Sequence, residues 1–171
     1  MTNHIHLLVT PDERESVAQL MMGIGRRYVR YINGKYRRTG TLWEGRFKSS
    51  LVDQDAYFLA VSRYIELNPV RANMVIGPQH YPWSSFHHNA LGKRNELVTE
   101  HVTYKALADD ELNRQLAYRK LFDVEMSDQE IKSLRVGLGS RGFVGNDRFR
   151  EAVEAMLGRD VGVNKHGGAR Q

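Results

Sequence analysis

A proline that follows a helical pattern is the feature that most limits how this chain can fold. Residues 55–67 carry apolar and aromatic side chains at helical spacing, and Pro69 lacks the N–H that a helix interior needs. We therefore expect a helix that ends just before Pro69. Tyr64 and Asn68 are four residues apart, so they lie on one face of that helix end. This arrangement places a phenol hydroxyl beside an amide oxygen.

Local chemistry also offers ordinary structural roles for both side chains. Asparagine before proline is a good N-cap for a new short helix over residues 70–75. A tyrosine on an apolar stripe is commonly a core aromatic whose hydroxyl bonds at the periphery. From spacing alone, these structural roles and a chemical role for Tyr64 and Asn68 both remain open.

A second constrained segment lies near the start of the sequence. Residues 4–10 are mostly β-branched and apolar and are followed by Pro11, which predicts a strand. Because side chains alternate along a strand, His4 and His6 share one face at a separation of roughly 7 Å. Two imidazoles at that spacing can bind one metal ion, and two polar side chains on a solvated strand face are the alternative.

A dense run of basic and aromatic side chains follows. We expect a helix that begins with a capping box of Ser16 and Gln19 and ends near Gly34. Cationic side chains neutralise phosphates and aromatic rings stack on unpaired bases, so the run predicts a surface for single-stranded or looped nucleic acid, with a solvated basic face as the alternative. The candidate DNA-binding residues are Arg26, Arg27, Arg30, Lys35, Arg37, Arg38, Trp43, Arg46 and Lys48.

Composition narrows the class of protein. The chain has 171 residues, 41% hydrophobic and 26% charged, which is typical of one globular domain with an appendage. It contains no cysteine, which excludes disulfides, thiolate metal sites and cysteine nucleophiles. The formal net charge of +5 favours a polyanionic partner. No apolar run reaches the ~20 residues of a membrane span, and we expect a cytoplasmic, nucleoid-associated protein.

The rest of the chain predicts one more strand and several helices. A strand is expected over residues 43–52, followed by a helix capped by Asp53 or Asp55. Ser127 with Glu130 forms the capping box of a later helix.

Composition also suggests where the chain divides. Residues 91–102 are polar and predict a linker after a first domain over 1–90. Residues 103–158 predict a helical accessory region, in which Asn146 caps the last helix and Gly158 ends it. Residues 159–171 are polar and basic, which predicts a disordered tail.

Three segments together resemble the single-tyrosine HUH transposases, in particular their REP-associated tyrosine transposase branch. They are residues 1–11 with the His4-Ile5-His6 core, residues 38–49, and residues 63–72 followed by 81–86. The segments occur in the family's order over about the first ninety residues, and the resemblance depends on all three together.

The resemblance implies an α+β fold, in which helices pack on an antiparallel sheet that carries His4 and His6. It makes Tyr64 the catalytic nucleophile and Asn68 the third metal ligand. Mg²⁺ or Mn²⁺ would polarise the scissile phosphate, and attack by Tyr64 would leave a 5′-phosphotyrosine and a free 3′-hydroxyl. The implied function is that of a transposase that cuts and joins single-stranded or hairpin DNA of REP type, as a monomer or homodimer.

The sequence departs from the family at its start. The family's domain usually begins before the histidine strand, whereas Met1 here occupies a position that is internal in the family and Thr2 replaces the commoner proline. We therefore expect an amino-terminally truncated or mis-started copy whose sheet is incomplete. The alternative function is a catalytically inactive DNA-binding relic.

Overall fold

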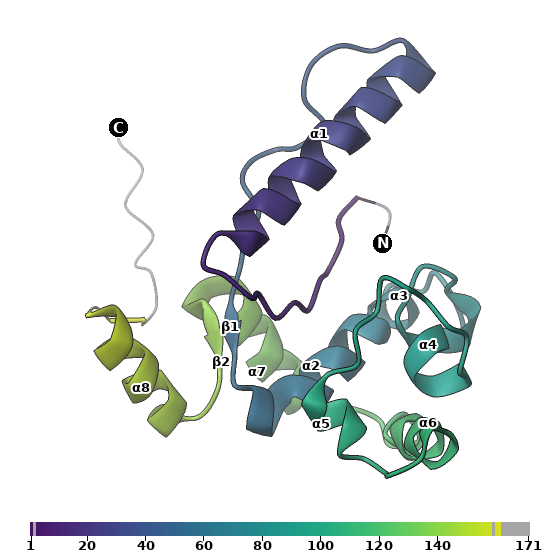
Figure 1. Ribbon diagram of the computed structural model, residues 1–171, viewed down its shortest axis with the longest axis vertical. Coiled ribbons are helices and arrows are strands. Elements are labelled where there is room, and N and C mark those ends of the chain that lie inside the picture. Colours follow the sequence, from purple (N-terminus) through teal and green to yellow (C-terminus); the bar gives the residue numbers. More distant parts are fainter. Residues whose placement is uncertain (2, 159, 162–171) are drawn as a thin grey trace. The chain divides into compact units, whose positions relative to one another are not determined.

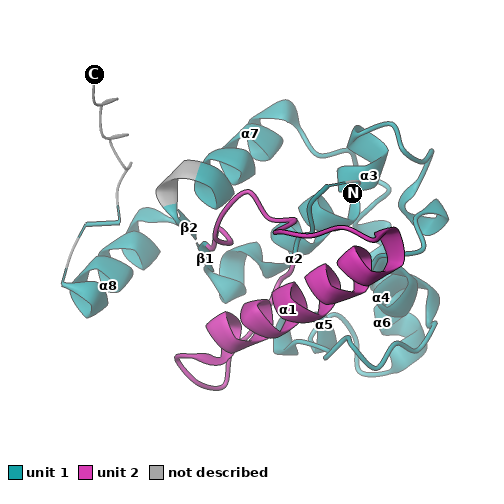
Figure 2. Cartoon of the chain, turned by 90° about the horizontal axis from the view of Figure 1, so that it is seen from above, with its two compact units in different colours: residues 1–6, 50–171 teal, residues 7–49 magenta. Residues whose placement is uncertain are grey.

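The computed structural model describes residues 1, 3–158 and 160–161 (Figure 1). The chain divides into two compact units (Figure 2). Unit 1 contains Met1–His6 and Ser50–Gln171, and unit 2 contains Leu7–Ser49. The predicted disordered tail over residues 159–171 lies outside the described residues, apart from 160–161.

Unit 2 consists of one long helix and the segments that lead into and out of it. Helix α1 (Ser16–Tyr36) confirms the predicted helix, but both of its ends differ from the prediction. Its N-cap is Glu15, which makes no side-chain cap hydrogen bond. The predicted capping box does not form, because the Ser16 hydroxyl instead accepts a hydrogen bond from the backbone N–H of Glu13.

The carboxyl end of α1 lies beyond the predicted stop at Gly34. Arg37 adopts the left-handed conformation, with φ 50° and ψ 45°, and its N–H donates to the Asn33 carbonyl. The N–H of Arg38 donates to the same carbonyl. Gly34 therefore remains inside the helix, and a non-glycine residue takes the left-handed turn that usually favours glycine.

Unit 1 is mainly helical, and its helices carry the remaining candidate residues (Figure 1). Besides a 3₁₀ turn over Pro78–His80 and a π-helical turn over Gly137–Arg141, its described helices are α2 (Gln54–Glu66), α3 (Asn68–Arg71), α4 (Phe86–Leu91), α5 (Val102–Lys105), α6 (Glu111–Lys120), α7 (Asp128–Val136) and α8 (Asp147–Leu157). None of the helices in the described residues is long and apolar enough to cross a membrane.

The sheet is where the fold differs most from the prediction. Its two strands within the described residues, β1 (Leu51–Val52) and β2 (Phe143–Val144), pair in parallel. The predicted antiparallel sheet is therefore wrong, because β1 finds its partner in the glycine-rich stretch after α7. Residues 4–10 form no strand, and the strand predicted over 43–52 keeps only its last two residues.

The predicted helix caps of unit 1 are largely confirmed. Asp53 caps α2 by accepting from the N–H of Asp55, and Ser127 and Glu130 form the predicted capping box at α7. Asn146 caps α8, and Gly158 ends it in the left-handed conformation with φ 62°. Each of these bonds spans three residues or fewer, so local sequence is sufficient to predict them.

The core of unit 1 is aromatic and joins helices from both sides of the predicted linker. Phe86, Ala90, Tyr104 and Tyr118 are buried together. Helix α4 packs on α6, and α5 packs on α2 and α6. Residues 91–102 therefore separate no compact units, because helices α5 and α6 share a core with the helix that carries Tyr64.

A buried carboxylate connects three of these packed segments. Glu66, near the end of α2, is 2% exposed. Its Oε1 accepts hydrogen bonds from Ser85 Oγ at 2.6 Å and from Asn89 Nδ2 at 3.3 Å, and its Oε2 accepts from the Tyr118 hydroxyl at 2.9 Å. Burial raises the pKa of Glu66 to about 7, although the three hydrogen bonds act to lower it. This cluster holds the end of α2, and therefore Tyr64, against α4 and α6.

Candidate active site and nucleic-acid interface

Within unit 1, the structure brings His6 close to the predicted nucleophile, and His4 lies beside His6. The ring centres of His4 and His6 are 5.0 Å apart, and the rings are nearly perpendicular at 87°. The ring centre of His6 lies 6.5 Å from that of Tyr64. The histidines reach this position on an irregular segment, so the strand alternation that predicted their shared face is not what brings them together.

The two imidazoles are compatible with one shared ion. Metal–nitrogen bonds of about 2.0–2.1 Å place ring centres roughly 3 Å from an ion, which is consistent with two rings 5.0 Å apart. Nδ1 of His4 lies 2.8 Å from Asn3 Oδ1. When Nδ1 carries the proton of this hydrogen bond, Nε2 keeps the lone pair that a metal needs.

Electrostatics favour the neutral form of the second histidine. Partial desolvation lowers the pKa of His6. The charge of His4, when that ring is protonated, and the charge of Arg71 act in the same direction. A neutral imidazole is the form that ligates a metal, so the surroundings of His6 suit a ligand.

Asn68 contacts Arg71, the residue that covers the Tyr64 ring, but does not act as the predicted N-cap. Helix α2 leads directly into α3 through Leu67, which keeps a helical conformation and is both the C-cap of α2 and the N-cap residue of α3. Asn68 is thus the first residue of α3, so both the cap and the predicted helix over 70–75 are wrong. Its Oδ1 accepts from Arg71 Nη2 at 3.2 Å, and its Nδ2 is buried without a hydrogen-bond partner.

The donor set combines one hard amide oxygen with two borderline imidazole nitrogens, so it can hold a divalent cation that accepts both kinds of ligand. An amide oxygen has two lone pairs, so the bond from Arg71 leaves one of those on Asn68 Oδ1 free. No group of three or more histidine or carboxylate side chains in the described part of the chain is placed to hold a metal. Two imidazoles and one amide oxygen, from His4, His6 and Asn68, are therefore the ligands that we test further.

Arg71 is the residue of this site that sequence reasoning missed. Its guanidinium carbon lies 4.4 Å from the centre of the Tyr64 ring, and its Nη2 donates to the backbone carbonyl of Tyr64 as well as to Asn68. A signal was present, since Tyr64, Asn68 and Arg71 follow the spacing i, i+4, i+7 of one helix face. The proline between them suggested a break that the continuous α2–α3 path does not make.

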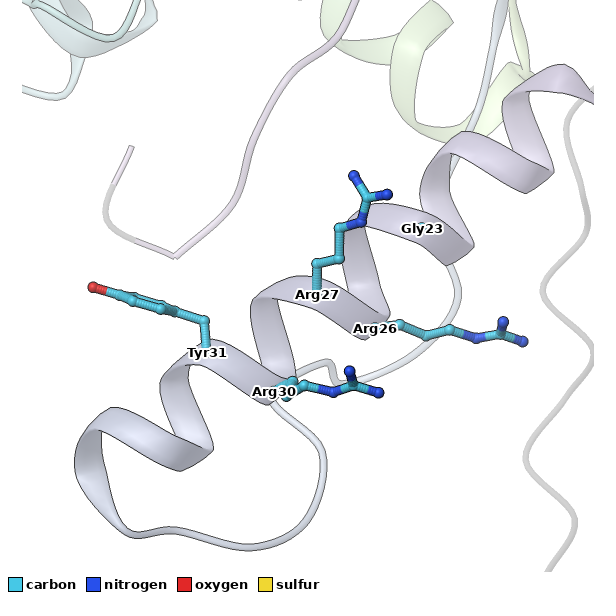
Figure 3. A pocket seen from close by; sticks show the side chains of 5 residues that line it. All are labelled: Gly23, Arg26, Arg27, Arg30 and Tyr31. Carbon is cyan, nitrogen blue, oxygen red and sulfur yellow. The ribbon is translucent and has the colours of Figure 1, made fainter.

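In unit 2, part of the predicted basic surface forms a recess on α1. Figure 3 shows this recess, about 480 Å³ in volume and lined by one glycine, three arginines and one tyrosine. Tyr31 is 59% exposed, which leaves its ring free to stack. The lining residues are Gly23, Arg26, Arg27, Arg30 and Tyr31.

The other candidate DNA-binding residues of unit 2 do not line this recess. Lys35 on α1 lies with its Nζ 5.6 Å from the centre of the Tyr31 ring. Trp43 packs against α1, with its ring centre 5.9 Å from that of Tyr28, and lies close to Gly25. The remaining candidates are exposed and lie after α1: Arg37, Arg38, Arg46 and Lys48.

We expect the charge and the ring of this recess to affect DNA binding differently. Replacing Arg26 and Arg30 together by Gln is expected to reduce the slope of log affinity against log salt by about 1.4 for single-stranded DNA, since each lost phosphate contact removes about 0.7. Tyr31→Ala is expected to cost about 1–3 kcal/mol of binding free energy with an unchanged slope, because stacking releases no counterions. Fluorescence anisotropy at several salt concentrations measures both quantities.

Arg14 provides the control for this comparison. It is an exposed arginine of unit 2 outside the recess. Arg14→Gln removes one positive charge, half of what the double variant removes. A reduction in slope of about 0.7 for Arg14→Gln would therefore contradict a specific role for Arg26 and Arg30.

Comparison with known families supports one class of protein for the first part of the chain. Residues 1–68 match the family model described as transposase, IS200 like. The match spans His4, His6, α1, Tyr64 and Asn68, and it supports the transposase family without distinguishing the REP-associated branch. No curated protein and no solved structure matches the chain.

Proposed function

We propose that this chain is a transposase that cuts and rejoins single-stranded DNA through a covalent bond to Tyr64. The observation that carries the proposal is the grouping of His4, His6 and Tyr64 within one compact unit, with ring centres 5.0 and 6.5 Å apart. The family match over residues 1–68 supports the transposase class.

The proposed reaction conserves phosphodiester bonds. The Tyr64 hydroxyl loses its proton and its oxygen attacks the scissile phosphorus, forming a phosphotyrosine bond. The bond from phosphorus to the 3′-oxygen breaks, and that oxygen takes up a proton to become a free 3′-hydroxyl. One phosphate ester replaces another, so attack by a 3′-hydroxyl on the phosphotyrosine rejoins DNA without ATP.

In this proposal His4, His6 and Asn68 hold Mg²⁺ or Mn²⁺. A divalent cation bound there would polarise the scissile phosphate and stabilise its developing negative charge. The protein's own contribution is to keep His6 neutral, to hold the Tyr64 ring near His6 and Arg71, and to hold Asn68 through Arg71.

The basic recess of α1 is proposed to bind the strand. Its cations contact phosphates, and the exposed Tyr31 stacks on an unpaired base. The finer proposal is a REP-type hairpin substrate, bound by a monomer or homodimer in the cytoplasm at the nucleoid.

Covalent capture tests this function directly. The full chain is incubated with hairpin oligonucleotides that have randomised single-stranded flanks and a label at the 3′ end, because the fragment with the 3′ end stays on the tyrosine. We expect a labelled protein band on a denaturing gel with Mg²⁺ or Mn²⁺ and none when EDTA removes the metal. Absence of the band under every metal condition would reject the enzyme.

An inactive DNA-binding relic is the second candidate function. It is favoured by the burial of Tyr64, which is only 7% exposed and must still reach a phosphorus atom. Salt-sensitive binding of the same oligonucleotides without any covalent band would support it.

A further inference from the structure

One side chain of the candidate site has more hydrogen-bond donors than the protein satisfies. Arg71 uses its Nη2 for the Tyr64 carbonyl and for Asn68 Oδ1. Its Nε and Nη1 are buried and have no hydrogen-bond partner among the described residues. Buried donors of native proteins are nearly always satisfied, and an unmet one commonly indicates a ligand, ion or water. Two buried donors of the guanidinium that covers the Tyr64 ring are therefore unsatisfied.

The charge of Arg71 also lacks a counter-ion. The salt bridges of the described residues join other cations to acids, and none of them includes Arg71. Desolvation is costly for a half-buried cation unless an opposite charge compensates it. An anionic ligand would meet both deficits of Arg71, the missing charge and the missing acceptors.

A second arginine reinforces the positive potential at this place. Burial is the main cause that lowers the pKa of Arg71, attraction to Tyr64 opposes it, and the charge of Arg135 lowers it further. Arg135 is exposed on α7, and this helix packs on α2, which leads directly into the helix that carries Arg71. Like charges repel, so an anion between or beside the two arginines would be attracted to both.

We propose that Arg71 and Arg135 form a binding site for one phosphate of the DNA strand, next to Tyr64. The identification of the anion as a DNA phosphate rests on the proposed function, whereas the open donors and the uncompensated charge do not. Arginine suits this role because its guanidinium stays charged and presents several donors in a fixed plane. The guanidinium of Arg71 also holds the Tyr64 carbonyl and Asn68, so it fixes the phosphate relative to the nucleophile.

The site is tested by counting phosphate contacts in a protein that cannot react. All variants carry Tyr64→Phe, and the probe is a fluorescein-labelled oligothymidine of about 12 nucleotides, within the range of single-strand site sizes. Affinity is measured at several NaCl concentrations. We expect Arg71→Gln to reduce the slope of log affinity against log salt by about 0.7, Arg135→Gln to do the same, and Arg71→Lys to keep the slope.

Arg148→Gln is the matched control. The side chain of Arg148 is exposed on α8 and makes no hydrogen bond or salt bridge within the described residues. The slope of log affinity against log salt for Arg148→Gln is therefore expected to equal that of the parent protein. Inorganic phosphate, added at constant ionic strength, tests whether the site binds free phosphate as well as a phosphate of the DNA strand. Displacement of DNA from the parent but not from Arg71→Gln shows that the site also accepts free phosphate.

A folded Arg71→Gln protein with an unchanged slope would overturn the inference. If Arg71→Gln does not fold, as judged by circular dichroism, the slope of Arg135→Gln decides in the same way. Covalent capture by the chain with Tyr64 intact tests the proposed function separately. A band on that gel with no change in slope rejects only the phosphate site, whereas a reduced slope without a band keeps the site and rejects the transposase chemistry.

Discussion

Tyr64→Phe is expected to abolish covalent capture of the 3′-labelled hairpin oligonucleotides while leaving their noncovalent binding unchanged. The substitution removes only the hydroxyl, which is the attacking group, so the loss is complete and not partial. The ring that lies beside His6 and under Arg71 remains in place. Denaturing gels measure the covalent product, and anisotropy measures the affinity.

Tyr57→Phe is the control for this result. Tyr57 lies two helical turns earlier on α2 and loses the same hydroxyl. Capture at the parental rate is expected for Tyr57→Phe. If Tyr64→Phe still formed the covalent band, the nucleophile would be another group and the proposed role of Tyr64 would be wrong.

Glu66→Ala is expected to lower the free energy of unfolding by about 3 kcal/mol or more, a large part of the stability of an ordinary domain. The substitution leaves the donors of Ser85, Asn89 and Tyr118 without their acceptor and opens a cavity among packed helices. Urea unfolding followed by circular dichroism measures the change. Glu151→Ala is the control, since Glu151 is exposed on α8 and its loss is expected to change stability by less than about 0.5 kcal/mol.

Glu66→Gln separates the charge of this side chain from its shape. The pKa of Glu66 is raised from its ordinary 4.5 to about 7, so the native protein keeps a proton in that interval which the unfolded chain releases. Stability contributed by this group is therefore present at low pH and is lost as pH rises through this interval, by roughly 3 kcal/mol in total. Glu66→Gln has no proton to release and is expected to lack this decline.

The quantity to measure is the difference in unfolding free energy between the parent protein and Glu66→Gln. This difference is measured at several pH values between about pH 5 and pH 8. Subtracting the two free energies at each pH removes the titration of groups that both proteins share. A constant difference across this range would contradict the raised pKa of Glu66.

Helices and their caps could be predicted from the sequence to a large extent. Asp53, Ser127 and Asn146 each bond to a backbone group at most three residues away, and the structure confirms all three caps. The capping box at Ser16 and the cap at Asn68 were wrong for the same reason. The backbone just before each of these residues stays helical, with no extended residue to begin a new helix there.

The candidate site could be predicted only in part. Spacing and family resemblance identified His4, His6, Tyr64 and Asn68, and the structure places the two histidine rings and Tyr64 together. Arg71 was missed, because the role of this arginine depends on the acceptors that surround it, and the sequence does not show which donors remain open.

By itself, therefore, the sequence determined the long basic helix α1, the helix that ends near Tyr64 and most of the helix caps, because these depend on neighbours within one or two turns. Only the tertiary structure decided the parallel pairing of β1 with β2, the burial of Glu66 and the uncompensated charge of Arg71. Each of these depends on segments that are distant in the sequence. A strand needs a partner, and burial and charge compensation need a packed environment that local sequence does not specify.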